Sequence, residues 1–450
     1  MTCHVSGFSK RVTLPAMGLS TCVLGVLLTF SSGAGAQSLS GMLEAARQFD
    51  ATYLSDTAAA RATYAAAKLD NASTLPKVSL VSSVTQSNVY VSGETTDTLS
   101  RYIGVSASHS LYNENYAAEA KKVPLGEQTA ATLQSVANQS LIIRVAQAYF
   151  DTLTAQDTLV SVQASKKAAS QQLAAANRNF EVGNTTITDS REAQAQFDLI
   201  TAEEITAANN LELAKLALSQ LTGVKSPQPK AFIADQLPNL SAQSLDTWIL
   251  RASEVNLAVA SARVDLENAR LDLEIAKAGG KPTLDLTMSY LQNGTSSAHT
   301  SANTSSYKPT TSVALAFNWP LYTGGAVENA IAAALEKENK ASADLENATR
   351  TATNQVKRAF LGLQSGMSQA MALQAALVSS QSALEANQLG YEVGVRINID
   401  VLNAQTAVYK TQASLAKARH DVLLDSLKLR QAVGVLSDAD VDAVSRLLQP

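Results

Sequence analysis

Two aspartates are the residues of this chain best placed for local chemistry, because each follows a turn-forming stretch and begins a helix-forming one. Asp189 lies in NFEVGNTTITDSREAQ (179–194) and Asp400 lies in GYEVGVRINIDVLNAQ (390–405). Thr188 and Asp400 stand where an oxygen acceptor can cap free backbone N–H groups, and an acid there also suits the helix dipole. Taken by themselves, these residues predict helix capping.

Residue types that catalyse reactions or bind metals are scarce and scattered. The two cysteines, Cys3 and Cys22, both fall within the first 36 residues. The histidines beyond that point are His109, His299 and His420, which are far apart in the sequence. Each is explained most simply as a polar surface or strand residue. We therefore expect no enzyme activity, no metal site and no cofactor.

Residues 1–36 have the pattern of a secretory signal peptide. Lys10 and Arg11 precede an apolar run, and an A-x-A cleavage site ends at Ala36, which would make Gln37 the first mature residue. The alternatives are a retained anchor and a lipidated Cys22, but no basic cluster follows the run, and the run continues past Cys22. Cleavage removes two cations and changes the formal charge from −4 to −6, which argues against a nucleic-acid partner.

The two aspartate stretches are copies of one pattern. A shift of 211 residues carries Gly183 onto Gly394 and Asp189 onto Asp400, together with their neighbours. Gly183 and Gly394 tolerate the left-handed backbone conformation that closes a helix, so each copy should turn there between two helices. The repetition predicts an internal duplication. Its parts are a first repeat at 37–225, a linker at 226–250, a second repeat at 251–436 and a tail at 437–450.

Long segments without glycine or proline predict unusually long helices. They are residues 127–182, 184–222, 239–278 and 395–433, and they are rich in the strongest helix formers. A helix over 127–179 would be on the order of 80 Å long, which no single compact core buries. Taken alone, these helices also fit an elongated coiled coil.

Other segments alternate between apolar and polar residues and predict strands. The alternation is clear in 283–290 and 312–321 and weaker in 76–91 and 103–111, so we expect one hairpin at about 76–112 and another at about 283–321. The stretches 92–100 and 292–309 are polar and read as water-facing loops. Apolar faces, aromatic residues near the strand ends and long polar loops match an outer-membrane barrel, with a soluble sheet as the alternative.

The number of predicted strands decides how such a sheet would meet lipid. Four strands cannot close a barrel, and lipid does not tolerate open sheet edges, so other copies must supply the remaining strands. Three copies would supply twelve. The predicted fold class is therefore mixed α and β, with a trimeric outer-membrane β-barrel continued by a long α-helical barrel.

Three motifs carry a resemblance to a known family. They are WPLYTGG (319–325), YEVGVR (391–396) and DVL (400–402). Together with the duplicated pattern over residues 39–436, they resemble the TolC family of outer-membrane efflux and secretion proteins. The resemblance implies a homotrimer in outer-membrane lipid that extends into the periplasm. It also implies a periplasmic adaptor protein and an inner-membrane transporter of the ABC, RND or a similar class.

The resemblance also gives the repeated stretches a role in a gate at the tunnel entrance. Tyr391 and Arg396 match positions on an inner helix pair, and Thr188 and Asp189 match their acceptors on an outer pair. Asp400 matches a carboxylate that lines the constriction. Asn403 stands where a second acid is common, which implies a less negative ring and weaker block by divalent cations.

Two other protein classes share part of this pattern. A periplasmic adaptor has a signal peptide and helical hairpins, but it has one hairpin between short β-rich domains and lacks the 211-residue repeat. A secreted coiled-coil structural protein leaves the alternating segments unexplained. The sequence does not indicate whether the cargo is drugs, metal ions or protein, since that selection belongs to the inner-membrane partner.

Overall fold

The computed structural model describes residues 37–91, 94–183, 185–231, 244–297 and 308–448. The predicted signal peptide, both cysteines and His299 lie outside these residues. The predicted combination of long helices and one antiparallel sheet is confirmed. Among the described residues, no helix combines the length and the apolar character needed to cross a membrane.

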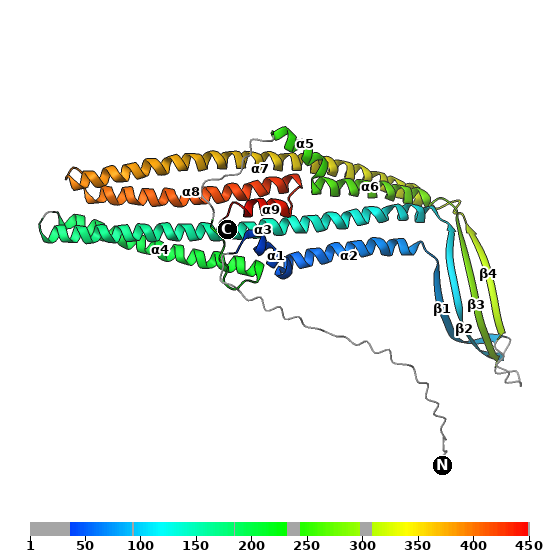
Figure 1. Cartoon of the computed structure of the whole chain (residues 1–450). Coiled ribbons are helices and arrows are strands. Elements are labelled where there is room, and N and C mark those ends of the chain that lie inside the picture. The colour runs from blue at the N-terminus through cyan, green and yellow to red at the C-terminus, as the bar shows by residue number, and fades with distance from the viewer. Residues whose placement is uncertain (1–36, 92–93, 184, 232–243, 298–307, 449–450) are drawn as a thin grey trace, which may run out of the picture. The chain divides into compact units, whose positions relative to one another are not determined.

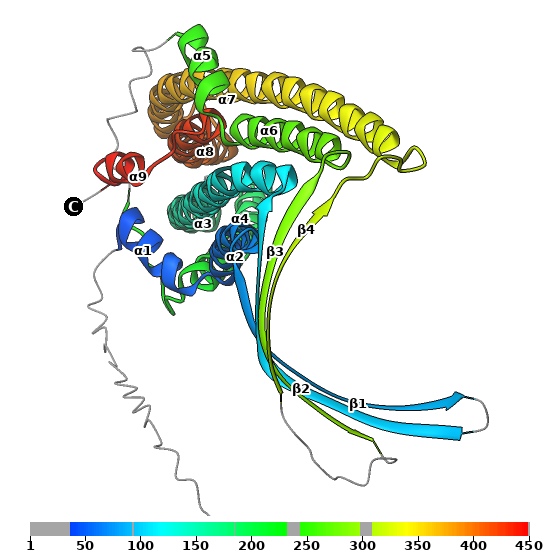
Figure 2. The same cartoon turned by 90° about the vertical axis from the view of Figure 1, so that its right-hand side faces the viewer.

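One sheet holds four antiparallel strands in the order β1, β2, β3 and β4. The strands are β1 Lys77–Val91, β2 Glu94–Tyr112, β3 Thr283–Ser297 and β4 Lys308–Asn318. Figure 2 shows them side by side as one curved sheet. Consecutive strands form the two predicted hairpins, and the central pair, β2 and β3, joins them.

The two faces of the sheet differ in chemistry because side chains alternate along each strand. The register places apolar residues from all four strands on one face: Val78, Leu80, Val105, Ala107, Leu284, Leu286, Met288, Val313, Leu315 and Phe317. The opposite face carries a row of serines, one from each strand: Ser79, Ser106, Ser289 and Ser312. In this row the hydroxyls of Ser289 and Ser312 lie 2.8 Å apart.

The strands extend into both segments that the sequence predicted as loops. The expected loop at 92–100 is wrong, because β2 begins at Glu94 and pairs with β1 from the Val91↔Glu94 position onward. Threonine dominates this part of β2, and its branched side chain suits a strand despite its polarity. In the expected loop at 292–309, β3 continues to Ser297 and β4 starts at Lys308.

Two antiparallel helix pairs make up most of the remaining chain. Helix α3 (Glu114–Glu181) pairs with α4 (Ile187–Thr222), and α7 (Ala326–Glu392) pairs with α8 (Asn398–Val433). Helix α3 has 68 residues and extends beyond its predicted segment, and α7 has 67 residues and was not among the predicted segments. The two turns that join these pairs lie at the same end of the helices (Figure 1).

Helix α3 starts at Glu114, thirteen residues before the predicted start at Glu127, and contains Pro124. Packing against other helices offsets the cost of a proline in this part of the helix. A Cβ added at Gly126 would lie 2.6 Å from the Cβ of Ala67 in α2 (Ala51–Ser73), so the close approach of these helices requires glycine. Lys121 adds an ion pair with Glu274 of α6 (Leu257–Ala278).

The predicted helix at 239–278 is two helices, α5 (Leu245–Val255) and α6. Asn256 separates them in an extended conformation, and its side chain accepts hydrogen bonds from the backbone N–H groups of Ala258 and Val259. Its amide also donates to the carbonyl of Ala432 at 2.7 Å. The break therefore fixes the end of α8 against the junction of α5 and α6.

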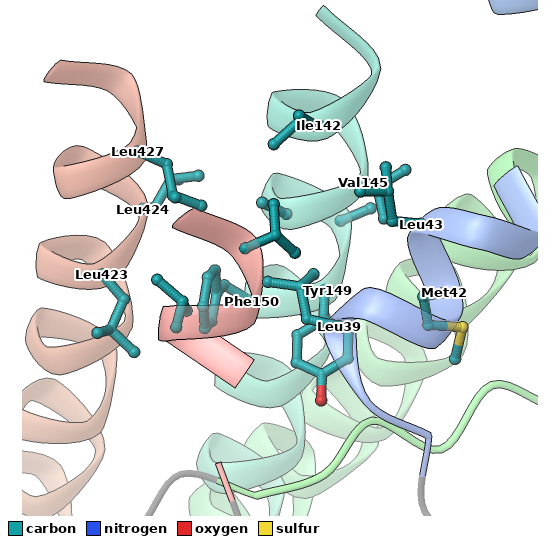
Figure 3. Close-up of a cluster of buried hydrophobic side chains, with 14 of the residues drawn as sticks. Leu39, Met42, Leu43, Ile142, Val145, Tyr149, Phe150, Leu423, Leu424 and Leu427 are labelled. Atoms are coloured by element: carbon teal, nitrogen blue, oxygen red, sulfur yellow. The ribbon is translucent and has the colours of Figure 1, made fainter. Parts of the chain in front are cut away.

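A core cluster of buried apolar side chains includes residues from the middle of α3. Figure 3 shows side chains of this cluster from several helices. The cluster includes two short helices that the sequence did not predict, α1 (Leu39–Phe49) and α9 (Asp438–Ser445). Tyr149 and Phe150 of α3 are almost fully buried in it and pack edge to face. Leu218 of α4 and three leucines of α8 also belong to it, so this cluster holds both helix pairs together.

Candidate functional site

The turn between α3 and α4 is closed by its own side chains. Gly183 has φ of 78°, and Thr186 caps α4. The hydroxyl of Thr186 accepts a hydrogen bond from the N–H of Asp189. The Asp189 carboxylate in turn accepts from both the N–H and the hydroxyl of Thr186, each at 3.0 Å. Because this reciprocal capping box satisfies free donors at the helix start, the turn is self-contained.

The turn between α7 and α8 has the same glycine conformation but no such cap. Gly394 also has φ of 78°, and the N–H groups of Val395 and Arg396 both donate to the carbonyl of Gly390. Ile397 occupies the N-cap position of α8 and has no side-chain acceptor. The Asp400 carboxylate instead lies 3.6 Å from the Arg396 guanidinium. This pair is half exposed, so its contribution to stability is less than about 1 kcal/mol.

Gly390 fixes where the Arg396 side chain leaves the turn. A Cβ added at Gly390 would lie 2.7 Å from the Cγ and 3.3 Å from the Cβ of Arg396. The stem of Arg396 therefore packs directly over the bare backbone at the end of α7. Its side chain remains 58% exposed, which leaves guanidinium donors available beyond the contact with Asp400.

Polar side chains link the two helix pairs just behind the turns. Asn179 of α3 donates to the hydroxyl of Tyr391 at 3.2 Å, and Gln172 of α3 donates to the side chain of Asn398 in α8. A small apolar cluster that includes Leu402 lies beside these bonds. Within one copy, the two turns are thus held together by side-chain bonds and a modest buried core.

The structure brings some of the predicted site residues together and leaves others apart. Arg396 and Asp400 form an ion pair, and Tyr391 contacts Asn179. In the described part of a single copy, no hydrogen bond or ion pair joins Tyr391 or Arg396 to Thr188 or Asp189. Asn403 is exposed one turn beyond Asp400 on the same helix.

The predicted capping residues need correction. Thr188 does not cap α4, since Thr186 holds that position and Thr188 is exposed in the first turn. The pattern Thr186-x-x-Asp189 is a capping box that the sequence displays, so this signal was available. Asp400 lies in the first turn of α8 but provides no cap bond. Its acidic charge still complements the helix dipole.

Sequence reasoning missed three contributors to this end of the molecule: Asn179, Gln172 and Asn398. Asn398 is only 4% exposed, and its side-chain oxygen accepts a hydrogen bond from the amide of Gln172. Lone polar residues within helices carry no sequence signal for a partner on another helix. The described residues hold no group of three or more His, Cys, Asp or Glu side chains arranged for a metal ion.

Comparison with known proteins gives consistent matches. The family described as Outer membrane efflux protein matches residues 36–224 and 248–435. Outer membrane protein TolC of Vibrio cholerae is 33% identical over 430 residues, covering 93% of this chain and 95% of that protein. TolC of Escherichia coli is 34% identical over 333 residues, covering 72% of this chain and 68% of that protein.

A solved structure shares the fold at low sequence identity. The Campylobacter jejuni CmeC outer membrane channel matches with a TM-score of 0.76 and 17% identity. The match covers 91% of this chain and 90% of that chain. The arrangement of sheet and helices is therefore common to this chain and to a known channel.

Proposed function

This chain belongs to the outer membrane efflux protein family, the family of TolC, and from that premise we propose that three copies form one gated conduit. As a family member it is an outer-membrane channel of an efflux or type I secretion system, and it extends into the periplasm. Such systems also contain an adaptor and an inner-membrane transporter. Channels of this family are passive, and no step of the proposal involves catalysis.

The edges of the sheet support assembly into a closed ring. In the described residues, β1 and β4 each pair with a strand on one side only. With four antiparallel strands, β4 runs opposite to β1, so β4 of one copy can continue the antiparallel pattern with β1 of the next. A head-to-tail contact of this kind closes into a ring when the rotation fits. Three copies would give a barrel of twelve strands.

The chemistry of the two sheet faces fits lipid outside and water inside. Val313, Leu315 and Phe317 of β4 are each about two thirds exposed on the apolar face, at 64% to 66%. In lipid this surface would be buried, which stabilises the membrane-inserted form by roughly 25 cal/mol per Å². The opposite face would line the pore with serine hydroxyls from all four strands. The contrast between the exposed apolar face and the serine face is the observation that supports the proposal most directly.

The proposed gate lies at the two turns. Arg396 of one copy, with donors left over from its weak pair with Asp400, would reach Asp189 of the neighbouring copy, while Tyr391 would reach Thr188. Asp189 uses one carboxylate oxygen for the capping box and keeps the other available. Each link would be worth about 1 kcal/mol, and three copies would hold the entrance closed reversibly. Three Asp400 carboxylates would favour cations at the constriction.

The homotrimer and the link between neighbouring copies can be tested by cross-linking. The mature chain would have no cysteine, so a variant with Asp189→Cys and Arg396→Cys has only the two introduced thiols. A bifunctional thiosulfonate reagent that spans the length of the replaced side chains should produce a covalent trimer on a non-reducing gel, and reduction should dissolve it. The matched control pairs Arg396→Cys with Arg191→Cys, on an exposed position of the same helix α4, and should give little trimer. Equal products from both variants would refute the assigned contact.

A further inference from the structure

The first residue after the predicted cleavage site is fixed into the fold by its backbone. Gln37 forms an isolated parallel bridge with Pro229, and its N–H donates to the carbonyl of Gln228 at 2.8 Å. Its own carbonyl accepts from the N–H of Lys230 at 3.2 Å and from the hydroxyl of Tyr149 at 3.1 Å. Cleavage after Ala36 would therefore create a new amino terminus inside a formed hydrogen-bond network.

A free amino group suits this position poorly. An α-amine has a pKa near 8 and is mostly charged at neutral pH, with three N–H donors where the structure provides one acceptor, the carbonyl of Gln228. Helix α1 begins at Leu39, two residues further along, so the charge would also lie beside the positive end of the helix dipole. Both effects disfavour a cation at Gln37.

The side chain of Gln37 provides a carboxamide next to that amine. Its Oε1 atom is buried and has no hydrogen-bond partner among the described residues. Glutamine is the residue whose carboxamide can close a five-membered ring on its own α-nitrogen. No other residue is needed for this reaction, which requires only the uncharged fraction of the amine.

We propose that Gln37 becomes pyroglutamate once the signal peptide is removed. The α-nitrogen attacks Cδ of the same residue, the N–Cδ bond forms, and the Cδ–Nε2 bond breaks. Nε2 leaves as ammonia and takes up the proton that the α-nitrogen loses, so the step needs no oxidant, reductant or co-reactant. The lactam is neutral, so no charge lies next to the start of α1.

The modification has a structural consequence for α1. Ser38 caps this helix by accepting from the N–H of Gly41 at 3.2 Å, and Leu39 begins the buried face that enters the core cluster. With a neutral lactam directly before Ser38, no positive charge lies beside the positive end of the α1 dipole. It also blocks the chain end against aminopeptidases. The proposal depends on cleavage after Ala36 and is independent of the proposed gate.

Mass spectrometry of the full-length mature protein tests the proposal. Protein extracted from fresh membranes should give an amino-terminal peptide that begins at residue 37 and is lighter than its sequence by one ammonia. Sequential degradation should be blocked, and treatment with pyroglutamyl aminopeptidase should expose Ser38. The variant Gln37→Ala, which cannot form the ring, should be processed at the same site and carry an amine that reacts with amine-specific labels. A free Gln37 amine in the unaltered protein, or a chain starting elsewhere, would overturn the proposal.

Discussion

The two turns at the gate end have the same backbone and different side-chain contacts. Gly183 and Gly394 share a φ of 78°, and the 211-residue shift aligns the turns residue by residue. Thr186, which caps α4, aligns with Ile397, which cannot cap α8. Without a capping threonine, Asp400 takes no part in a capping box and pairs with Arg396 instead.

A second aligned pair extends the contrast. Asn179 has a side chain that reaches Tyr391, whereas its counterpart Gly390 has none and leaves room for the stem of Arg396. One turn is therefore locked within itself, and the other presents an exposed cation. The difference teaches that a few substitutions in a repeated turn suffice to separate a fixed element from one able to form contacts between copies.

Both turns depend on α8 staying docked on α3 behind them. Among the changes considered, acid should weaken that docking most. His420 of α8 is buried against Phe150, and its Nδ1 lies 2.9 Å from the hydroxyl of Thr154. Burial lowers the pKa of His420 from 6.5 to about 4. Between these pH values the unfolded chain binds a proton that the folded chain does not. The free energy of unfolding should therefore decrease by up to about 3 kcal/mol as the pH is lowered from 6.5 to about 4.

Other titratable groups lie near His420, so the experiment needs a variant that lacks only this histidine. Asp157 of α3 lies 3.7 Å away, and burial raises the pKa of its carboxyl; Lys417, Arg419 and Asp421 flank His420 on α8. Thermal unfolding in detergent from pH 7.5 to 4 should show the loss, and His420→Gln should flatten it. An identical acid dependence in this variant would assign the loss to other groups.

Exchanging the capping residues should exchange part of the behaviour of the two turns. Thr186→Ala removes the cap of α4 and should cost about 1 kcal/mol, with faster hydrogen exchange in its first turn. Ile397→Thr should slow exchange at the start of α8 by drawing Asp400 into a new capping box. Thr188→Ala is the matched control. It removes the proposed contact with Tyr391 of a neighbouring copy but not the cap, so hydrogen exchange in the first turn of α4 should stay unchanged. Equal effects of Thr186→Ala and Thr188→Ala would contradict the assignment.

Gly390→Ala should disturb the gate with little change in stability. The added methyl group would displace Arg396, while alanine favours the helix over glycine by about 1 kcal/mol, so the two effects largely cancel. Single-channel currents should therefore rise although the unfolding temperature hardly moves. Gly362→Ala on the same helix is the matched control, since a Cβ there meets nothing within 4 Å. Unchanged currents in both variants would mean that Gly390 does not determine where the Arg396 side chain lies.

The smallest expected effect concerns the acidic ring. Asn403→Asp would place a second acid one turn from Asp400 in each copy. At about 1 kcal/mol per close pair of charges in water, block by divalent cations should tighten roughly fivefold at most. The measurement is the concentration of Mg²⁺ that halves the single-channel current. Equal block of both proteins would mean that Asn403 does not face the constriction.

The features that the sequence predicted well are those set by local composition. Long runs without glycine or proline predicted α4 and α8 almost to their ends, and alternation located both hairpins. Segments that depend on a partner were misread. The start of α3 before Pro124 depends on packing against α2 and α6, and the break at Asn256 depends on a bond to Ala432 of another helix.

The gate residues divide in the same way. The Thr186-x-x-Asp189 box and the Arg396–Asp400 spacing of four residues are both local and could be read from the sequence. The contact of Asn179 with Tyr391 joins residues 212 positions apart, and the room above Gly390 exists only once the turn has formed. No periodicity reports either of them.

Planar-bilayer recording of the unaltered protein and of Arg396→Ser tests the central claim most directly. The account predicts small, cation-selective currents for the unaltered protein and a sharp rise in the variant, because the proposed link to Asp189 is lost. Thr186→Ala, which alters the self-contained turn, should leave the current small. Currents that stay small in Arg396→Ser, or rise equally in Thr186→Ala, would contradict the distinction between a fixed turn and a gating turn.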